Sequence, residues 1–505
     1  MNEIVMHLKS NENQARGLAE YGYRFMEVPL EAVAPEVWER LELFYLDSVA
    51  CGVSAISRQA NAPSVLRKEA LRNYKNDKGC YCYGSDIKVS PEKAILANSS
   101  AVREWDSNGT VFGYNPARGD TKGEFGHNDF YPVALAAAQI KGLSGAQVIK
   151  GMLLSDEIRG RLAEVYSLKD KKIDHVVHGA IASAVTYGVM MGASIDEIET
   201  AIGLLCAHYV PFRAIRAGHQ LSDSKGASAA FSTEVAIISV HRAHLGFVGP
   251  KDIFRNPEAL WCLFEKPEKG HSPFNLHLGL AGKDFSVMGM HFKLGLYEHQ
   301  SAGAIEVLLN LLKQNPAIYK EINGIESIDV TIYQPAYGII CDPEKWHPDT
   351  RQSADHSMPY ILATLLRKAS ERKTADWGEL ILLPDDYNDN AIKNIITQSI
   401  MPKIKIIHGG KEYDSKYPEG IPTSIRIKHT KAGEVKSNLI MYPFGHAKNT
   451  EADVKQLLNN KFNCLLKDAV NDVEEIKDKC TRIAHKSKQE VLDMTDFVIL
   501  EGDKI

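Results

Sequence analysis

Residues Arg103-Glu-Trp-Asp-Ser-Asn-Gly-Thr110, followed by Gly126-His-Asn-Asp-Phe-Tyr-Pro132, form the stretch on which our prediction of the fold rests. Apolar, helix-like segments flank this stretch at residues 94–102 and 133–139. Binding and catalytic residues concentrate where loops meet a rigid scaffold. Polar, titratable side chains between two apolar helices therefore predict a functional segment.

Within this stretch, residues 112–125 carry Gly, Asn and Pro and show neither a helical nor a strand period. A long irregular segment between helices is usually functional or disordered. We predict that Asp106, Thr110 and His127 take part in chemistry here. Helix capping by Asp106 and Asn128, together with one structural His, explains the same pattern about equally well from composition alone.

The composition is that of a soluble globular protein, with 44% apolar and 24% charged residues. A chain of 505 residues is too long for one ordinary core, so we expect two domains. The net charge of −5 and the lack of a basic block argue against nucleic acid or a membrane surface as the main partner. No apolar run reaches the length of a membrane-spanning helix.

The 8 cysteines are scattered, mostly within apolar runs, which indicates reduced thiols in a cytosolic protein. Cys80 and Cys82 are closely spaced, but C-x-C without a second pair is a poor zinc signal. The first residues, 1–9, show neither a secretory nor a transit pattern. We therefore expect a cytoplasmic location.

The first part of the chain is predicted to be helical. Pro35 begins an amphipathic run that ends near Gly52, as in a helix with Pro in its first turn. Small residues allow helix backbones to approach closely. They are abundant in three further segments, residues 132–139, 178–193 and 225–237. We expect a compact helical bundle with no strand before about residue 285.

The pattern changes after that point. Residues 325–333 alternate between apolar and polar types, and residues 401–408 are similar, as in half-buried strands. A Lys-Ala-Gly-Glu turn between residues 423–429 and 435–442 predicts a hairpin. We therefore predict a mainly α fold. It consists of a large all-helical domain, discontinuous in sequence (residues 1–287 and 447–505), and a smaller α+β lid domain (residues 288–446).

Two polar groups lie at expected helix starts. His178 precedes a Gly/Ala-rich helix, where an imidazole tends to be neutral and available as a base; a capping or core role is the simpler explanation of this residue alone. Lys225 enters another small-residue helix shortly after Arg213 and Arg216. A cation beside the N–H groups of a helix start suits an anion site, whereas the alternative is a solvated Lys.

Two further groups lie in the predicted lid or at its boundary. Lys293 and His299 lie where we place the domain boundary, and clefts between domains are preferred ligand sites. Arg351 and Tyr360 belong to a polar cluster that leads into a helix. Solvated or structural roles explain both groups equally well, taken alone.

The sequence contains no recognisable cofactor motif. No G-x-G-x-x-G after a strand, P-loop or G-x-S-x-G is present. His175 and His178 are spaced as a weak helical ligand pair, which does not amount to a metal site. We therefore expect chemistry by His, Asp, Lys and Arg side chains, with no cofactor and no metal.

Several of these motifs, in order, resemble the MmgE/PrpD family, whose members include 2-methylcitrate dehydratase and cis-aconitate decarboxylase. Asp106 and Thr110 resemble its D-x-x-x-T pair, and Gly126-His127 resembles its G-H-P-S-D segment. Residues 46–52 resemble an early helix of the family, His178-Gly179 its H-G-A helix start, and Lys225 its active-site Lys. Further along, Phe292-Lys293 resembles its F-K motif, and the segment from His299 to Glu306 resembles its H-S-Q-T-A-V-E-A motif. The segment from Tyr442 to His446 resembles its Y-P-x-G-H motif.

The resemblance implies a helical domain with a smaller lid, a homodimer, and a cofactor-free site between the domains for small di- or tricarboxylates. This chain departs from the family where Asn128 replaces the Pro and Ser, and in the longer spacing that residues 112–125 create. We expect this insert to shape the substrate pocket through Arg118, Asp120 or Lys122.

Elimination and decarboxylation both pass through concentrated negative charge, which cations stabilise. Proton transfer is most efficient from groups that titrate near neutral pH. We predict a catalytic set of Asp106, Thr110, His127 and His178, and a substrate-binding set of Lys225, Lys293, Arg216, His299, Arg351 and Tyr360.

Three functions remain open at this stage. The leading one is a dehydratase acting on 2-methylcitrate or a similar hydroxy-polycarboxylate. The second is a decarboxylase of the cis-aconitate type, or an isomerase or epimerase of a related acid. The third is a non-catalytic paralogue that binds a carboxylate, which the presence of all the expected proton-transfer residues argues against.

Overall fold

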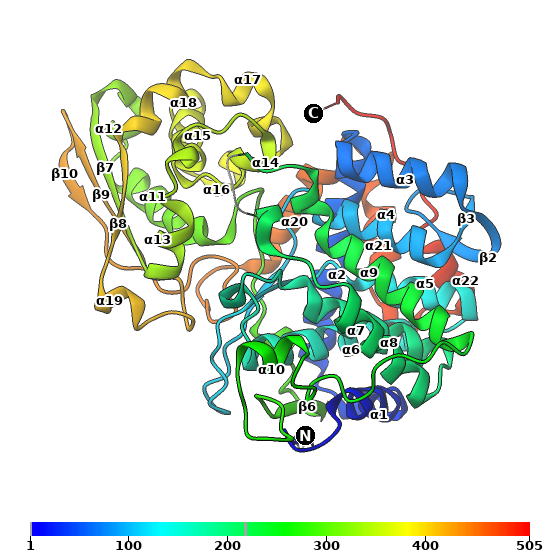
Figure 1. The fold of residues 1–505 in the computed structure, drawn as a ribbon. Helices are drawn as coiled ribbons and strands as arrows, with labels where there is room; N and C mark the ends of the chain where they lie inside the picture. The colour runs from blue at the N-terminus through cyan, green and yellow to red at the C-terminus, as the bar shows by residue number, and fades with distance from the viewer. Residues whose placement is uncertain (1–2, 217–219, 505) are drawn as a thin grey trace.

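The structure is a computed structural model that describes residues 3–216 and 220–504. It shows a large helical part beside a smaller part that holds a four-stranded sheet (Figure 1). The predicted mainly α fold with a smaller α+β part is confirmed.

The helical part is built around α7 (Val176–Met191). Every residue of this helix from Val176 to Met190 is buried, as expected for a helix that is apolar on all sides. Helix α7 packs against α1, α5, α6, α8 and α9. The helices of this part are α1 (Gln14–Glu27), α2 (Pro35–Ser57), α3 (Asn61–Asn73), α4 (Pro91–Arg103), α5 (Tyr131–Lys141), α6 (Gly145–Val165), α8 (Ile195–His208), α9 (Asp223–His244) and α10 (Leu260–Phe264).

The prediction of no strand before about residue 285 is wrong. Three two-stranded sheets lie there: β1 (Ile4–Leu8) with β6 (Leu276–Ala281), β2 (Lys75–Tyr81) with β3 (Lys88–Val89), and β4 (Thr110–Phe112) with β5 (Phe125–His127). Strands β3, β4 and β5 are too short to show a period of two, and β1 pairs with a strand at the far end of the helical segment. Local pattern does not reveal such pairings.

The four-stranded sheet of the smaller part has the order β10-β9-β7-β8. Its strands are β7 (Ile325–Ile332), β8 (Ile404–His408), β9 (Thr423–His429) and β10 (Gly433–Lys436). Strands β9 and β10 form the expected hairpin, and β7 pairs with β8 in parallel. The helices around this sheet are α11 (Ala302–Gln314), α12 (Ala317–Lys320), α13 (Gln334–Ile340), α14 (Arg351–Ala354), α15 (Met358–Arg372), α16 (Trp377–Leu380), α17 (Asp389–Ile392), α18 (Ile395–Ile400) and α19 (Lys411–Asp414).

The last helices return to the helical part. They are α20 (Val454–Leu466), α21 (Val473–Cys480) and α22 (Lys488–Asp493). Helices α20 and α21 pack on α2, and α22 packs on α5 and α6. The far C-terminal segment therefore lies beside helices from the first part of the chain (Figure 1). The predicted domain bounds stay a prediction.

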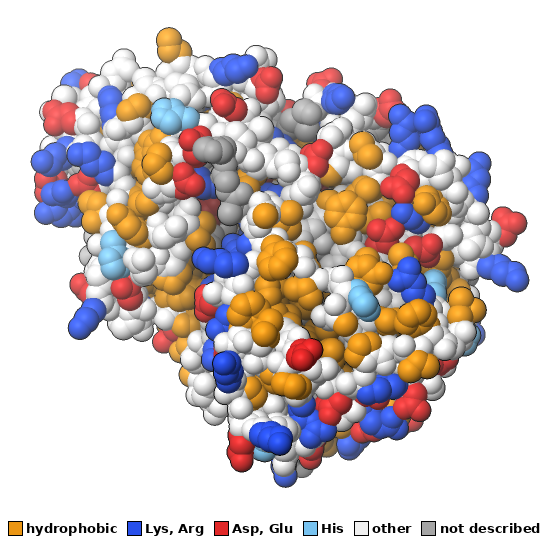
Figure 2. All heavy atoms as spheres, in the orientation of Figure 1, with side chains coloured by type: hydrophobic (Ala, Val, Ile, Leu, Met, Phe, Trp, Pro, Cys, Tyr) orange, Lys and Arg blue, Asp and Glu red, His pale blue; other side chains and the backbone are white. Residues whose placement is uncertain are grey.

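Apolar side chains gather on the visible face of the helical part (Figure 2). Val65 of α3 and Phe231 of α9 are both exposed, and these two helices pack against each other. The homodimer implied by the resemblance stays a prediction. In such a dimer, an apolar face of this kind would be buried between the two subunits. In the part of the chain that the structure describes, no helix has the length and apolar character needed to cross a membrane.

Candidate active site

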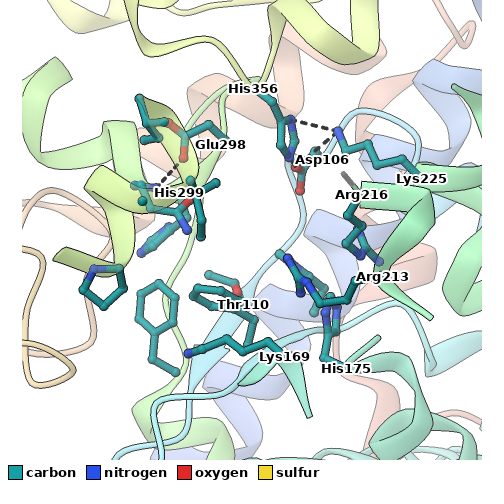
Figure 3. Close-up of a pocket in the computed structure, with 18 of the residues that line it drawn as sticks. Asp106, Thr110, Lys169, His175, Arg213, Arg216, Lys225, Glu298, His299 and His356 are labelled. Carbon is teal, nitrogen blue, oxygen red and sulfur yellow. Dashed lines mark hydrogen bonds and ion pairs between the residues drawn. The ribbon is translucent and has the colours of Figure 1, made fainter. Parts of the chain in front are cut away.

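A cavity of about 790 Å³ receives side chains from both parts of the molecule. Arg103, Asp106 and Lys225 come from the helical part, whereas His299 and His356 come from the smaller part (Figure 3). The charged residues that line it are Arg103, Asp106, Lys122, Lys169, Asp170, Lys172, Arg213, Arg216, Lys225, Lys293, Glu298, Asp342 and Lys345. Basic groups outnumber acidic ones among them, so the cavity favours an anionic ligand.

The segment with which the sequence analysis began enters this cavity as a hairpin. Strands β4 and β5 pair so that Thr110 lies opposite His127, and the predicted insert is the loop between the strands. Thr110 also exchanges two backbone hydrogen bonds with His291, at 2.9 and 2.7 Å. Lys293 follows two residues later, so this backbone bridge brings three functional segments together.

The carboxylate of Asp106 is the centre of the charged cluster. Its Oδ1 lies 2.6 Å from Lys293 Nζ and contacts Arg103, and its Oδ2 lies 3.4 Å from Lys225 Nζ and 2.8 Å from His356 Nε2. The backbone of Asp106 has a φ of 48°, a left-handed conformation that is unusual for a residue other than Gly and is often found at functional sites.

The charges in this cluster determine its protonation states. Burial alone would raise the pKa of Asp106, but Arg103, Lys293, Lys225 and His356 together hold it well below its usual range. Burial lowers the pKa of Lys293 to about 8, even though Asp106 raises it. Asp106 is therefore an anion at neutral pH, and the role in proton transfer that we predicted for it stays a prediction.

His356 belongs to this cluster, and the sequence analysis did not select it. Its Nε2 faces Asp106 and its Nδ1 faces Asp355 and lies 2.9 Å from Lys225 Nζ. Asp106, Asp355 and His356 are also spaced so that they could hold a metal ion. However, the ammonium of Lys225 already contacts both carboxylates, and a cation in this position opposes a metal cation.

Three buried imidazoles line the cavity. Among the described residues, the Nδ1 of His127 and both ring nitrogens of His175 and His299 have no hydrogen-bond partner. Burial, reinforced by nearby positive charge, holds the pKa of each well below its usual value. Neutral imidazoles beside a cationic cluster can accept a proton from a bound substrate.

The structure brings most of the predicted set into one cavity. Asp106, Thr110, His127, Lys225, Lys293, Arg216 and His299 all line it. Arg216 is tied to Asp174 by an ion pair. His175, His356 and Lys345 also line the cavity and had not been selected. For His175 the signal was its position before a small-residue helix, which we had attributed to His178.

Three predicted residues lie outside the lining. His178 is buried and its Nε2 lies 3.1 Å from the carbonyl of Tyr166. Arg351 binds Glu104 and Asp355 behind the cavity. The hydroxyl of Tyr360 donates to the carbonyl of Asp386. Each side chain contacts a neighbour within the fold, which a pattern of polar residues does not show. Of the insert residues, Lys122 lines the cavity, whereas Arg118 binds Asp284.

A buried ion pair supports the cavity from behind. Lys461 of α20 lies 2.6 Å from the Oδ1 of Asp47 on α2, and both side chains are fully buried. The same ammonium donates to the carbonyls of Ser107, at 2.6 Å, and Lys293, at 2.8 Å. One carbonyl belongs to the segment that carries Asp106, and the other to the segment that carries the Lys293 amine. Lys461 therefore fixes the position of one segment relative to the other.

Comparison with known proteins identifies the family. A model of the MmgE/PrpD N-terminal domain matches residues 18–270, and one of the MmgE/PrpD C-terminal domain matches residues 297–483. The chain belongs to the MmgE/PrpD family.

Curated relatives are distant but extend over most of the chain. A protein of Salmonella typhi named 2-methylcitrate dehydratase is 22% identical over 468 residues, covering 90% of this chain and 92% of its own. A fungal protein named alkylcitrate dehydratase is 23% identical, covering 87% and 86%. A protein of Aspergillus oryzae named cis-aconitate decarboxylase-like is 20% identical, covering 82% and 83%.

Lys461→Met leaves the carboxyl of Asp47 buried without its partner, or forces it to take up a proton. We expect a loss of about 3–5 kcal/mol in the free energy of unfolding, measured by denaturant titration. The double variant Asp47→Leu/Lys461→Met should recover most of that stability but not the turnover, because the two carbonyls still lack their donor. A fully active double variant would show that Lys461 does not position the site.

His178→Gln tests whether this residue is structural. Burial lowers the pKa of His178 to about 4, below its unfolded value, so its neutral form stabilises the fold above about pH 6.5 and this contribution is lost as the pH falls toward 4. The stability advantage of the wild type over the variant should therefore shrink by roughly 3 kcal/mol between pH 7 and pH 4. Turnover at pH 7 should stay within a few-fold. A large fall in kcat in a variant that still folds would show that His178 has a catalytic role.

Proposed function

We propose that this protein is a lyase that removes water from a hydroxy-polycarboxylate, such as 2-methylcitrate, using its own acidic and basic side chains. The observation that carries the proposal is the cationic cluster around Asp106, which faces neutral imidazoles across one cavity. The similarity to relatives named 2-methylcitrate dehydratase and alkylcitrate dehydratase supports the same reaction class.

The first requirement is to bind carboxylate groups. Lys293 and Lys225 share Asp106 as their counter-ion, so their ammonium groups are fixed before a substrate arrives. Such preorganised cations stabilise the negative charge that develops when a proton leaves the carbon next to a carboxylate. Asp106 does not itself transfer a proton in this scheme, because basic side chains already contact both of its carboxylate oxygens.

The second requirement is a base and an acid. We assign the base to His127, which lines the cavity beside Thr110 and whose burial, together with Arg103 and Lys293, keeps the imidazole neutral. It takes the C–H proton, the electron pair forms the C=C bond, and the C–O bond breaks. We assign the donation of the proton that converts the departing hydroxide into water to His356, which lines the cavity beside Asp106.

Purified protein incubated with 2-methylcitrate, citrate and cis-aconitate should form an unsaturated acid from at least one of the two hydroxy-acids, measured by ultraviolet absorbance, without release of CO₂. Release of CO₂ from cis-aconitate would instead show a decarboxylase, the activity in the name of one relative. No change with any of the three acids would contradict the proposal.

His127→Asn should lower kcat by roughly 10²–10⁴-fold while the melting temperature stays close to that of the wild type. In D₂O the wild type should exchange the reacting C–H proton of the substrate, and the variant should not. His244→Asn is the matched control, because His244 lies on α9 with its side chain 72% exposed. Equal losses in both variants would contradict the assignment of His127.

A further inference from the structure

The basic side chains of the cavity fall into two groups. Arg103, Lys225 and Lys293 all contact Asp106, so their charges are compensated by protein carboxylates. Lys169 and Arg213 lie toward the opposite end of the cavity from Asp106 (Figure 3). Neither forms an ion pair with a carboxylate among the described residues.

Of these two cations, Arg213 has the less complete set of hydrogen bonds. Its side chain is half-buried, and its Nη1 is buried without a hydrogen-bond partner in the described part of the chain. A buried guanidinium N–H without an acceptor is costly, and native structures normally supply one from protein, water or ligand. Lys169 donates to the carbonyl of Gly123 and lies 4.4 Å above the ring of Phe125, which leaves the rest of its ammonium for a ligand.

Both cations are held on an ordered backbone. Ile173 and Phe212 form an isolated antiparallel bridge, in which the N–H of Arg213 donates to the carbonyl of Lys172 at 2.9 Å. The N–H of Lys169 donates to Glu124 at 2.7 Å. The ion pair between Arg216 and Asp174 lies beside this bridge. The backbone that carries the two charges is therefore ordered before a ligand binds.

Nearby carboxyl groups do not neutralise this end. Asp174 is engaged by Arg216. Burial raises the pKa of Glu124 to about 7, although Lys169 lowers it, so Glu124 carries only part of a charge at neutral pH. Asp170 and Lys172 both line the cavity, carry opposite charges and are exposed to solvent. The balance of charge at this end stays positive.

We propose that Arg213 and Lys169 form a second anion subsite, which binds the carboxylate of the substrate that lies farthest from the reacting carbon. This inference rests on the proposed function and narrows the class of substrate. The substrate is then an acid with at least three carboxylates, two of them held near Asp106 and one at Arg213. The planar guanidinium suits such a group, because it binds a carboxylate through two parallel hydrogen bonds.

The size of the cavity agrees with this class of substrate. Its volume of about 790 Å³ would hold roughly two dozen water molecules at about 30 Å³ each, which is far more space than a short dicarboxylate fills. A dicarboxylate bound at the Asp106 cluster would leave Arg213 without an anion. An acid too short to reach Arg213 lacks one buried charge-assisted contact. The site therefore favours tricarboxylates over shorter acids.

Binding of two unreactive acids tests the subsite independently of turnover. Tricarballylate carries three carboxylates, and methylsuccinate is the same chain without one terminal carboxylate; isothermal titration calorimetry gives the Kd of each at fixed ionic strength. The wild type should bind tricarballylate roughly 10- to 100-fold more tightly than methylsuccinate. Arg213→Gln should bind both acids about equally well, and Lys169→Gln should reduce the difference in the same direction.

The matched control is Arg242→Gln, which removes the same charge from an exposed arginine that contacts Tyr209 outside the cavity. It should leave both affinities unchanged. Unchanged preference for tricarballylate in Arg213→Gln would overturn the subsite while leaving the proposed lyase intact. Failure of the wild type to bind either acid would overturn the proposed function as well. Should Arg213→Gln not fold, Arg213→Lys, which keeps the charge and loses the paired hydrogen bonds, should show an intermediate preference.

Discussion

Three basic side chains and one imidazole meet the carboxylate of Asp106 inside the protein, and the cavity depends on this contact. Without a central anion, Arg103, Lys225 and Lys293 would repel one another in a region of low dielectric. The carboxylate allows them to be buried together and to remain charged. The left-handed backbone of Asp106 costs on the order of 1–3 kcal/mol, which its many ionic contacts offset.

The fold supplies this cluster from segments that are far apart in the chain. Asp106 follows α4, Lys225 lies in the first turn of α9, and Lys293 follows the bridge between Thr110 and His291. His356 comes from the smaller part of the molecule. The buried pair of Lys461 and Asp47 ties the backbones of two of these segments to the C-terminal helices, so the helical part must be complete before the site can form.

Sequence pattern predicted the elements whose signal is local and long. The helix from Pro35, the strands of the four-stranded sheet and the hairpin after Thr423 follow from periodicity, whereas the short hairpin that pairs Thr110 with His127 does not. What pattern did not show is which polar side chain is already occupied. His178 binds the carbonyl of Tyr166 and Tyr360 binds that of Asp386, and both contacts arise only from tertiary packing. His356 was missed because Asp106, the carboxylate at its Nε2, lies on a distant segment of the chain.

The central claim is that Asp106 acts as an anion that keeps the cavity lysines charged for a carboxylate ligand. The most direct test is the pH dependence of tricarballylate affinity in the wild type and in Asp106→Asn. Burial lowers the pKa of Lys293 to about 8 and Asp106 raises it, so the wild type should lose affinity as the pH rises through about 8. The variant should lose it at a pH at least about one unit lower, because the amine deprotonates earlier. Identical profiles, or tighter binding by the variant at every pH, would contradict the account.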